Sequence, residues 1–271
     1  MKTINPYKTT LNINTAYWMA RIARDVYLSV SKEDPSPDEK TILNGLQQDD
    51  PRFIAATGQN RNSAQAALIE HADYLVLAFR GTDELADWLD NINAFAAAVL
   101  FGEVHRGFWN SLQDVWEPLY DKCKTLQKAN PRPLFLTGHS LGGAMATAAA
   151  ATLIHEDKPF TSVYTFGQPR ALTRATARIF NMECKSRYFR FHNNNDLVTR
   201  VPARMMGYSH VGTYLYISEE KKINRDPGFW YKFLDYIDGA IAAAKEKGLD
   251  GIEDHDIDKY LAAIEKWEFE D

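Results

Sequence analysis

The stretch LFLTGHSLGG, residues 134–143, constrains the fold of this chain most, because it sets one serine, Ser140, between two glycines. A short apolar run precedes it and a long Ala-rich segment follows it. Gly138 and Gly142 have no Cβ atom, so the backbone can turn sharply there and a helix can approach a strand closely. The pattern predicts a strand, a tight turn that carries Ser140, and a helix, in that order.

Apolar runs alternate with longer helical patterns along most of the chain. FIAATG, SAQAALIE and DYLVLAFRG predict early strands, and the helical patterns SLQDVWEPLYDKCKTLQKA and LGGAMATAAAATLIHE each precede a further apolar run, PLFLT and FTSVYTFG. This alternation is typical of an α/β fold, with a mostly parallel central sheet flanked by helices. We therefore expect a single α/β domain over residues 1–271.

The first fifty residues give a weaker pattern. A helix is expected from about Thr15 to Ser29, where apolar residues recur at roughly helical spacing. The stretch 31–50 carries two prolines and many charges. It is expected to be a surface loop with at most one short helical turn.

Composition excludes several classes of function. The net charge of −5 is spread over the chain without a basic block, so nucleic-acid binding has no electrostatic basis. No stretch reaches membrane-spanning length, and the first residues hold no apolar signal core. As written, the chain is expected to be cytoplasmic, although a removed signal or another route of secretion stays open. The two cysteines lack metal-ligand spacing, so no metal site is expected.

Ser140 is a candidate nucleophile, and a serine that merely occupies a turn is the alternative. In a strand-turn-helix elbow its Oγ would project at the carboxyl edge of the sheet, and the positive end of the helix would face a developing oxyanion. The elbow also makes the backbone N–H of Leu141 an oxyanion donor.

A serine nucleophile needs a base and a third group that orients the base. In this elbow the acid and then the histidine follow the serine. Asp196, in FHNNNDLVTRVP, comes after the apolar run SRYFRFH and is the acid candidate; a turn aspartate is the alternative. His210 and His255 are both candidate bases. His255 stands in a loop-like place among acids, whereas His210 leads into a strand and suits a packed histidine.

Taken together, these motifs resemble the class 3 lipases, the fungal-type branch of the α/β-hydrolases. The resemblance runs from about residue 74 onward and is carried, in that family's order, by LVLAFRGTDELADWLDN, VHRGFWNSL, LFLTGHSLGGAMA, VYTFGQPRAL, FHNNNDLVTRVP and DHDIDKYL. It implies an α/β-hydrolase fold and a catalytic triad of Ser140, Asp196 and His255. The residues before about 70 carry no motif that matches the family.

The resemblance also implies parts of the substrate site. Thr82 would supply an oxyanion donor beside Leu141, and residues 83–92 would form a short lid helix that carries Trp88. Asp87 or Asp90 would then support Thr82. The apolar run AFAAAVLF that follows, with Phe95 and Leu100, is either a core segment or part of an acyl groove or lipid-contact patch.

The implied activity is hydrolysis of acylglycerols or related fatty-acid esters through an acyl-enzyme, without metal or organic cofactor. The expected partner is a small-molecule or lipid ester, and transient contact with a lipid surface is compatible with it. Phospholipase, feruloyl-type esterase and short-chain carboxylesterase activities are alternatives within the same class. A non-catalytic α/β-hydrolase fold that binds lipid or another ligand is the alternative from a different class. Secreted fungal members carry signal peptides and several disulfides, so this chain resembles a bacterial or intracellular relative more closely.

Overall fold

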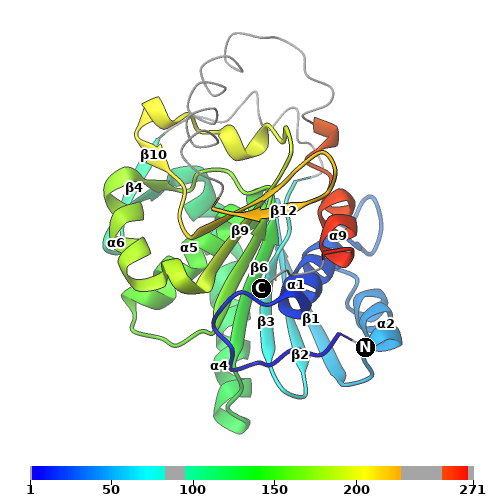
Figure 1. Cartoon of the computed structure of the whole chain (residues 1–271). Helices are drawn as coiled ribbons and strands as arrows, with labels where there is room; N and C mark the ends of the chain where they lie inside the picture. The colour runs from blue at the N-terminus through cyan, green and yellow to red at the C-terminus, as the bar shows by residue number, and fades with distance from the viewer. Residues whose placement is uncertain (1, 83–94, 227–251, 268–271) are drawn as a thin grey trace.

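The computed structural model describes residues 2–82, 95–226 and 252–267, and a central sheet of eight strands dominates it (Figure 1). In spatial order the strands are β1 (Phe53–Arg61), β2 (Ala64–His71), β3 (Leu75–Phe79), β6 (Leu134–His139), β7 (Ser162–Phe166), β9 (Tyr188–Asn193), β11 (Thr213–Ile217) and β12 (Ile223–Arg225). The strands from β3 to β11 are parallel, whereas β1 and β2 at one edge and β12 at the other pair antiparallel. The expected mostly parallel sheet is therefore confirmed.

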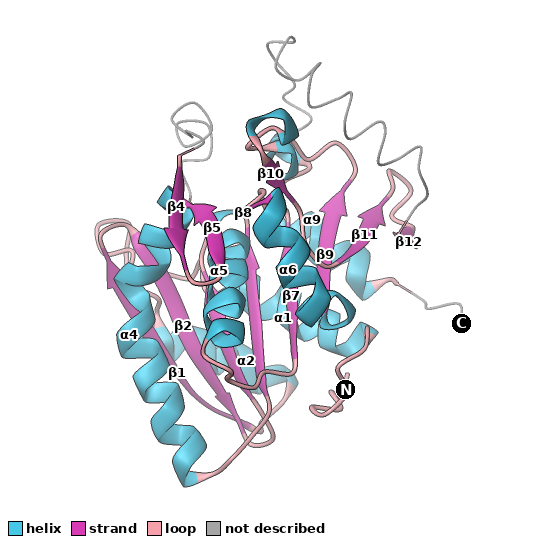
Figure 2. Cartoon of the chain, turned by 90° about the vertical axis from the view of Figure 1, so that its left-hand side faces the viewer, coloured by secondary structure: helices cyan, strands magenta, loops and turns pink. Residues whose placement is uncertain are grey.

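Helices cover both faces of this sheet. One face carries α1 (Ile13–Asp25), α2 (Glu39–Asp49) and α9 (Ile257–Glu265), and the other carries α4 (Arg106–Ala129), α5 (Leu141–His155) and α6 (Arg174–Cys184). Figure 2 shows the second group in front of the sheet. Each face buries its own apolar cluster, so the strands are apolar on both sides, as parallel strands between helices must be.

A second, smaller sheet lies beside α6. Its strands, in spatial order, are β10 (Tyr208–Ser209), β8 (Leu172–Thr173), β5 (Gly102–His105) and β4 (Ala96–Val99). Three short 3-10 helices, η1 (Lys185–Arg187), η2 (Val198–Arg200) and η3 (Arg204–Met206), connect the later strands. Residues 96–101 of the apolar run AFAAAVLF thus form an edge strand and the turn after it.

The expectation for residues 31–50 was wrong, because α2 occupies eleven of them. The Asp38 side chain caps this helix by accepting a hydrogen bond from the Thr41 N–H. Ile42 and Leu46, four residues apart, are fully buried, and α2 packs against β1. Tertiary burial of one narrow apolar stripe therefore stabilises a helix in a stretch that is otherwise polar.

The first helix is also shorter than expected, because α1 ends at Asp25 rather than near Ser29. The N–H groups of Tyr27 and Leu28 turn back to the carbonyls of Arg24 and Asp25. The chain leaves the helix there and carries Tyr27 toward the end of β6, where its hydroxyl contacts His139.

Candidate active site

Ser140 lies in the tight turn between β6 and α5 that the sequence predicted. Its backbone has φ 58° and ψ −130°, a left-handed conformation that is strained for a residue with a Cβ atom. The Ser140 N–H donates to the Phe166 carbonyl of β7 at 2.9 Å, which holds the turn against the neighbouring strand. A Cβ atom on Gly138 would collide with the backbone of Gly142, and one on Gly142 would collide with the Phe79 carbonyl, so both glycines are needed where strand and helix meet.

Asp196 and His255 form a buried hydrogen-bonded pair. His255 Nδ1 lies 2.9 Å from Asp196 Oδ2, and the two residues are 4% and 0% exposed. The Tyr260 hydroxyl donates to the same Oδ2 at 2.5 Å, and the Val198 N–H donates to Oδ1 at 2.8 Å. Three donors therefore hold this carboxylate in one orientation.

These donors also set the charge of Asp196. Burial alone would raise the pKa of its carboxyl, but the neighbouring His255, with further help from Tyr260, overrides burial and lowers the pKa to about 2. Asp196 is thus a carboxylate at neutral pH. Because a carboxylate only accepts hydrogen bonds, His255 Nδ1 donates the proton in this contact. A general base in such a site needs this orientation of the ring, with Nε2 turned toward the nucleophile.

The two atoms that would exchange a proton are both without a hydrogen-bond partner. Ser140 Oγ and His255 Nε2 are buried, and neither has a hydrogen-bond partner in the described part of the chain. Buried polar atoms are normally satisfied, but His210 Nδ1 is another exception, so the functional role of this pair also depends on the contact between His255 and Asp196. Ser140 itself is 1% exposed.

Gly167 leaves the space that the pair needs. It follows β7 directly, with φ +59°, and a Cβ atom on it would lie 2.8 Å from Asp196 Oδ2 and from His255 Nδ1. Its neighbour Phe166 accepts the Ser140 N–H, so the end of β7 contacts all three members of the predicted triad.

His139 and Tyr27 hold the histidine loop in place, and the sequence analysis did not identify either. His139 Nε2 lies 2.6 Å from the His255 backbone carbonyl, and the Tyr27 hydroxyl lies 2.8 Å from His139 Nδ1. A carbonyl can only accept, so Nε2 donates and Nδ1 accepts from Tyr27. Burial, together with the nearby His255, lowers the pKa of His139 to about 3, so the ring is neutral. His139 was present within the GHSLGG motif, but its partners are distant in sequence.

Thr82 and Leu141, the predicted oxyanion donors, both lie near the turn that carries Ser140. Thr82 lines a cavity of about 570 Å³ together with Tyr27, His139 and His255. The chain just before Thr82 runs against the elbow, since a Cβ atom on Gly81 would lie 2.9 Å from the Ser140 Cβ. Leu141 is the first residue of α5, where backbone N–H groups have no acceptor within the helix.

His210, the other candidate base, is hydrogen-bonded to a backbone carbonyl and not to the Asp196 carboxylate. Its Nε2 donates to the Thr199 carbonyl at 2.7 Å. Burial, followed by the charges of Arg190 and Arg170, lowers its pKa well below the usual value. The hydrogen-bond geometry therefore favours His255 as the base.

The predicted substrate residues are only partly within the described residues. The lid segment 83–92, including Trp88 and both aspartates considered as support for Thr82, lies outside them. Phe95 is 62% exposed, with the Arg106 guanidinium 5.7 Å from its ring centre. Leu100 occupies the turn after β4 and packs, half-buried, against the apolar core. Phe95 is thus open to a ligand, whereas Leu100 belongs to the core, and the acyl groove stays a prediction.

Two further properties concern the described residues alone. Within 2–82, 95–226 and 252–267, no three His, Cys, Asp or Glu side chains are grouped so that they could hold a metal ion. No helix in these ranges is both long and apolar enough to cross a membrane.

The chain is similar to several known proteins in sequence and in fold. Residues 76–206 match the model of the family described as lipase (class 3). The secreted mono- and diacylglycerol lipase A of Penicillium cyclopium is 32% identical over 150 residues, 53% of this chain and 48% of that protein. Phospholipase A1-II 1 of Oryza sativa subsp. indica is 26% identical over 226 residues, 72% of this chain and 56% of that protein. A solved mutant form of MDLA from Penicillium cyclopium has a TM-score of 0.72 at 21% identity, over 90% of this chain and 94% of that one.

The sheet, its flanking helices and the Ser140 elbow define an α/β-hydrolase fold, which the solved structure shares. Residues 76–206 match the class 3 lipase family model, in agreement with the resemblance found in the motifs. The matched region spans about half the length of the curated relatives.

One expectation is corrected by these relatives. The chain as written led us to expect a cytoplasmic protein, but the Penicillium relative is named a secreted lipase, as is a lipase of Fusarium solani that is 33% identical over 147 residues. These names point to a location outside the cell. The absence of an apolar signal core in the printed sequence was a poor guide.

Proposed function

We propose that this chain is a serine carboxylic-ester hydrolase that acts on acylglycerols or related fatty-acid esters through an acyl-enzyme. The observation that carries the proposal is the unsatisfied Nε2 of His255, whose Nδ1 is bonded to Asp196, at the same end of the sheet as the unsatisfied Oγ of Ser140. We further infer that residues 1–271 form a single domain around this site.

In the first step, Ser140 Oγ attacks the ester carbonyl while His255 Nε2 takes its proton. Asp196 stabilises the imidazolium that forms and keeps the ring in the correct orientation. His255 then gives the proton to the departing alcohol oxygen, which leaves the acyl group on Ser140. In the second step, a water molecule loses a proton to the same Nε2 and attacks the acyl carbonyl. The acid is released, and the proton returns to Ser140 Oγ.

Both steps pass through a negatively charged tetrahedral oxygen. Backbone N–H groups of Thr82 and Leu141, with the Thr82 hydroxyl, would donate to it. Loss of one such donor costs about 3 kcal/mol of barrier in comparable sites. The N-terminal end of α5 adds a favourable dipole, because Leu141 is the first residue of that helix.

The substrate class is proposed from the relatives and the apolar segments. The Penicillium relative is named as a lipase of mono- and diacylglycerols, and the Oryza sativa relative is named as a phospholipase A1. The Oryza sativa relative matches a larger share of this chain than the Penicillium relative does. Phospholipase activity is therefore the second candidate. Residues 83–92 with Trp88 would serve as the lid, and exposed Phe95 would contact the acyl chain or a lipid surface.

A series of p-nitrophenyl esters from acetate to palmitate tests the reaction, with the Ser140→Ala variant as control. Turnover of the long chains that disappears in Ser140→Ala supports a lipase, and turnover confined to acetate and butyrate supports a short-chain esterase. No Ser140-dependent turnover of any ester would refute the proposal in favour of a binding protein. Fatty-acid release from diolein and from phosphatidylcholine then separates acylglycerol from phospholipid substrates.

A further inference from the structure

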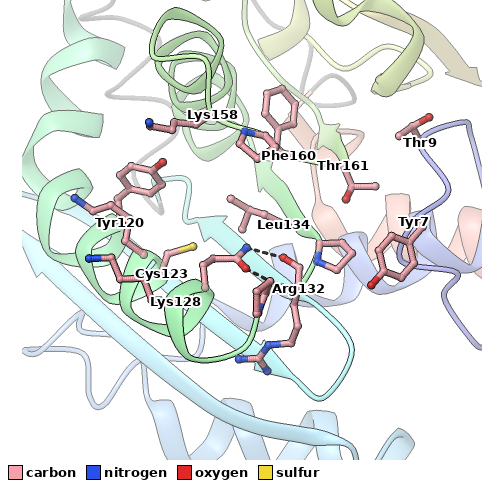
Figure 3. A pocket seen from close by; sticks show the side chains of 15 residues that line it. Tyr7, Thr9, Tyr120, Cys123, Lys128, Arg132, Leu134, Lys158, Phe160 and Thr161 are labelled. Atoms are coloured by element: carbon pink, nitrogen blue, oxygen red, sulfur yellow. Dashed lines mark hydrogen bonds between the residues drawn. The ribbon is translucent and has the colours of Figure 1, made fainter.

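A second, larger cavity opens at the opposite end of the central sheet from Ser140 (Figure 3). Its volume is about 790 Å³. Leu134, the first residue of β6, lies in its wall, whereas the last residue of β6 adjoins Ser140. A six-residue strand rises about 3.3 Å per residue, so the two sites are roughly 20 Å apart. The cavity is therefore separate from the candidate active site.

The floor of this cavity is apolar. Leu134, Cys123 and Phe160 line it and are at most 5% exposed, and the Tyr120 and Tyr7 rings stand at its sides (Figure 3). Burial raises the pKa of the Cys123 thiol to about 11, so this sulfur is a neutral part of the surface. A volume of this size with apolar walls is typical of a site for a small organic ligand.

The charged side chains of the wall all have one sign. Four basic residues line the cavity, and none of the described residues that line it is acidic, although the whole chain carries −5. Lys124 forms an ion pair with Asp121 at 2.6 Å, and Arg132 forms one with Glu70 at 2.8 Å. Lys128 and Lys158, which complete the set, are exposed and form no ion pair with any other described residue.

The two unpaired lysines come from separate elements that meet at this cavity. Lys128 is in the last turn of α4, and Lys158 follows α5 on the way to β7. Figure 3 shows both on the side of Leu134 that carries Tyr120. Basic side chains beside an apolar floor complement a ligand with one anionic end and one hydrocarbon chain.

We propose that this cavity binds a long-chain fatty acid as its carboxylate. The alkyl chain lies over Leu134, Cys123 and Phe160, and the carboxylate accepts hydrogen bonds from the ammonium groups of Lys128 and Lys158. The choice of a fatty acid among single-chain anions rests on the proposed function, because ester hydrolysis releases this compound. The site itself uses none of the residues of the candidate active site.

The test is the binding of palmitate, below its micelle concentration, to the full chain carrying Ser140→Ala, measured by titration calorimetry. In that background, Lys128→Glu with Lys158→Glu reverses both charges at the cavity. Lys32→Glu with Lys222→Glu is the matched control, because both lysines are exposed and neither forms an ion pair within the described residues. Thermal unfolding of each variant checks that the fold is retained.

We expect the cavity variant to bind palmitate about tenfold more weakly and the control to bind it within about twofold of the parent. Hexadecanol, which has the same chain without the charge, should bind the parent and the cavity variant equally. Equal palmitate affinity in the cavity and control variants would overturn the proposal and assign binding to an acyl groove near Ser140. No binding of palmitate to the parent would overturn it as well. Neither result depends on whether Ser140 hydrolyses esters.

Discussion

Replacement of Gly167 by alanine should wedge the Asp196–His255 pair apart. The added Cβ atom would lie 2.8 Å from both Asp196 Oδ2 and His255 Nδ1, and ordinary contact begins at 3.4 Å. Each of the two side chains must therefore move by about 0.6 Å, or the backbone must shift by a similar amount. A displacement of about 1 Å in a catalytic constellation costs roughly 10²-fold in rate. We expect kcat to fall by about that factor.

The same substitution also strains the backbone, since Gly167 has φ +59°. An alanine in this conformation costs about 1–2 kcal/mol in any protein. Gly207 provides the control, because it has φ +91° and no atom within 4 Å of the position of an added Cβ. Gly207→Ala should lose a similar free energy of unfolding and keep kcat within about twofold of the parent.

The assay pairs ester hydrolysis with chemical unfolding for both variants. A Gly167→Ala enzyme that keeps its full kcat would refute the reasoning, because the pair could then not need the space that Gly167 leaves. Equal losses of kcat in Gly167→Ala and Gly207→Ala would also refute it, since general strain would explain both.

Three further outcomes follow from the site. Asp196→Asn should lower kcat by about 10⁴-fold at neutral pH with little change in KM, because the amide allows the wrong imidazole tautomer. Steady-state kinetics that show a loss of kcat below tenfold would contradict this. Tyr27→Phe leaves His139 Nδ1 without its hydrogen-bond donor. We expect the free energy of unfolding to fall by about 1 kcal/mol and kcat to fall by up to about tenfold. An unchanged melting temperature and an unchanged kcat would contradict the role of Tyr27 in holding His139. Burial lowers the pKa of His139 to about 3 from 6.5, so the unfolded chain binds a proton there that the folded protein excludes. Stability should therefore fall as pH drops below 6.5, by about 1.4 kcal/mol per pH unit for this group, and denaturation series at several pH values should show a shallower fall for His139→Gln.

Local patterns predicted the parts of the structure that local chemistry determines. The elbow at Ser140 follows from glycines at fixed offsets between an apolar run and an Ala-rich segment, and most strands of the central sheet follow from short apolar runs. The helix after Asp38 was missed because its apolar stripe is only Ile42 and Leu46, within a stretch rich in charge and proline. This helix is stabilised by packing against β1, and a local sequence pattern cannot indicate such a tertiary contact.

The contacts around the pair were missed for a different reason. His139 and Tyr27 are 112 residues apart, and Asp196 and Tyr260 are 64 residues apart. Both Tyr260 and His139 stood inside motifs quoted from the sequence, so their positions were available as a signal. Nothing local indicated which atoms they would contact, because the parallel sheet brings these segments together.

Covalent labelling with a long-chain alkylphosphonate tests the central claim most directly. The reagent, used as its p-nitrophenyl ester, transfers the phosphonyl group to an activated serine with release of p-nitrophenolate, and it does not react with ordinary hydroxyl groups. The account predicts one adduct per chain, located on Ser140 by peptide mass spectrometry, and at least about 10³-fold slower labelling in the folded His255→Ala variant, which lacks the base. An adduct on another residue, or equal labelling rates with and without His255, would contradict it.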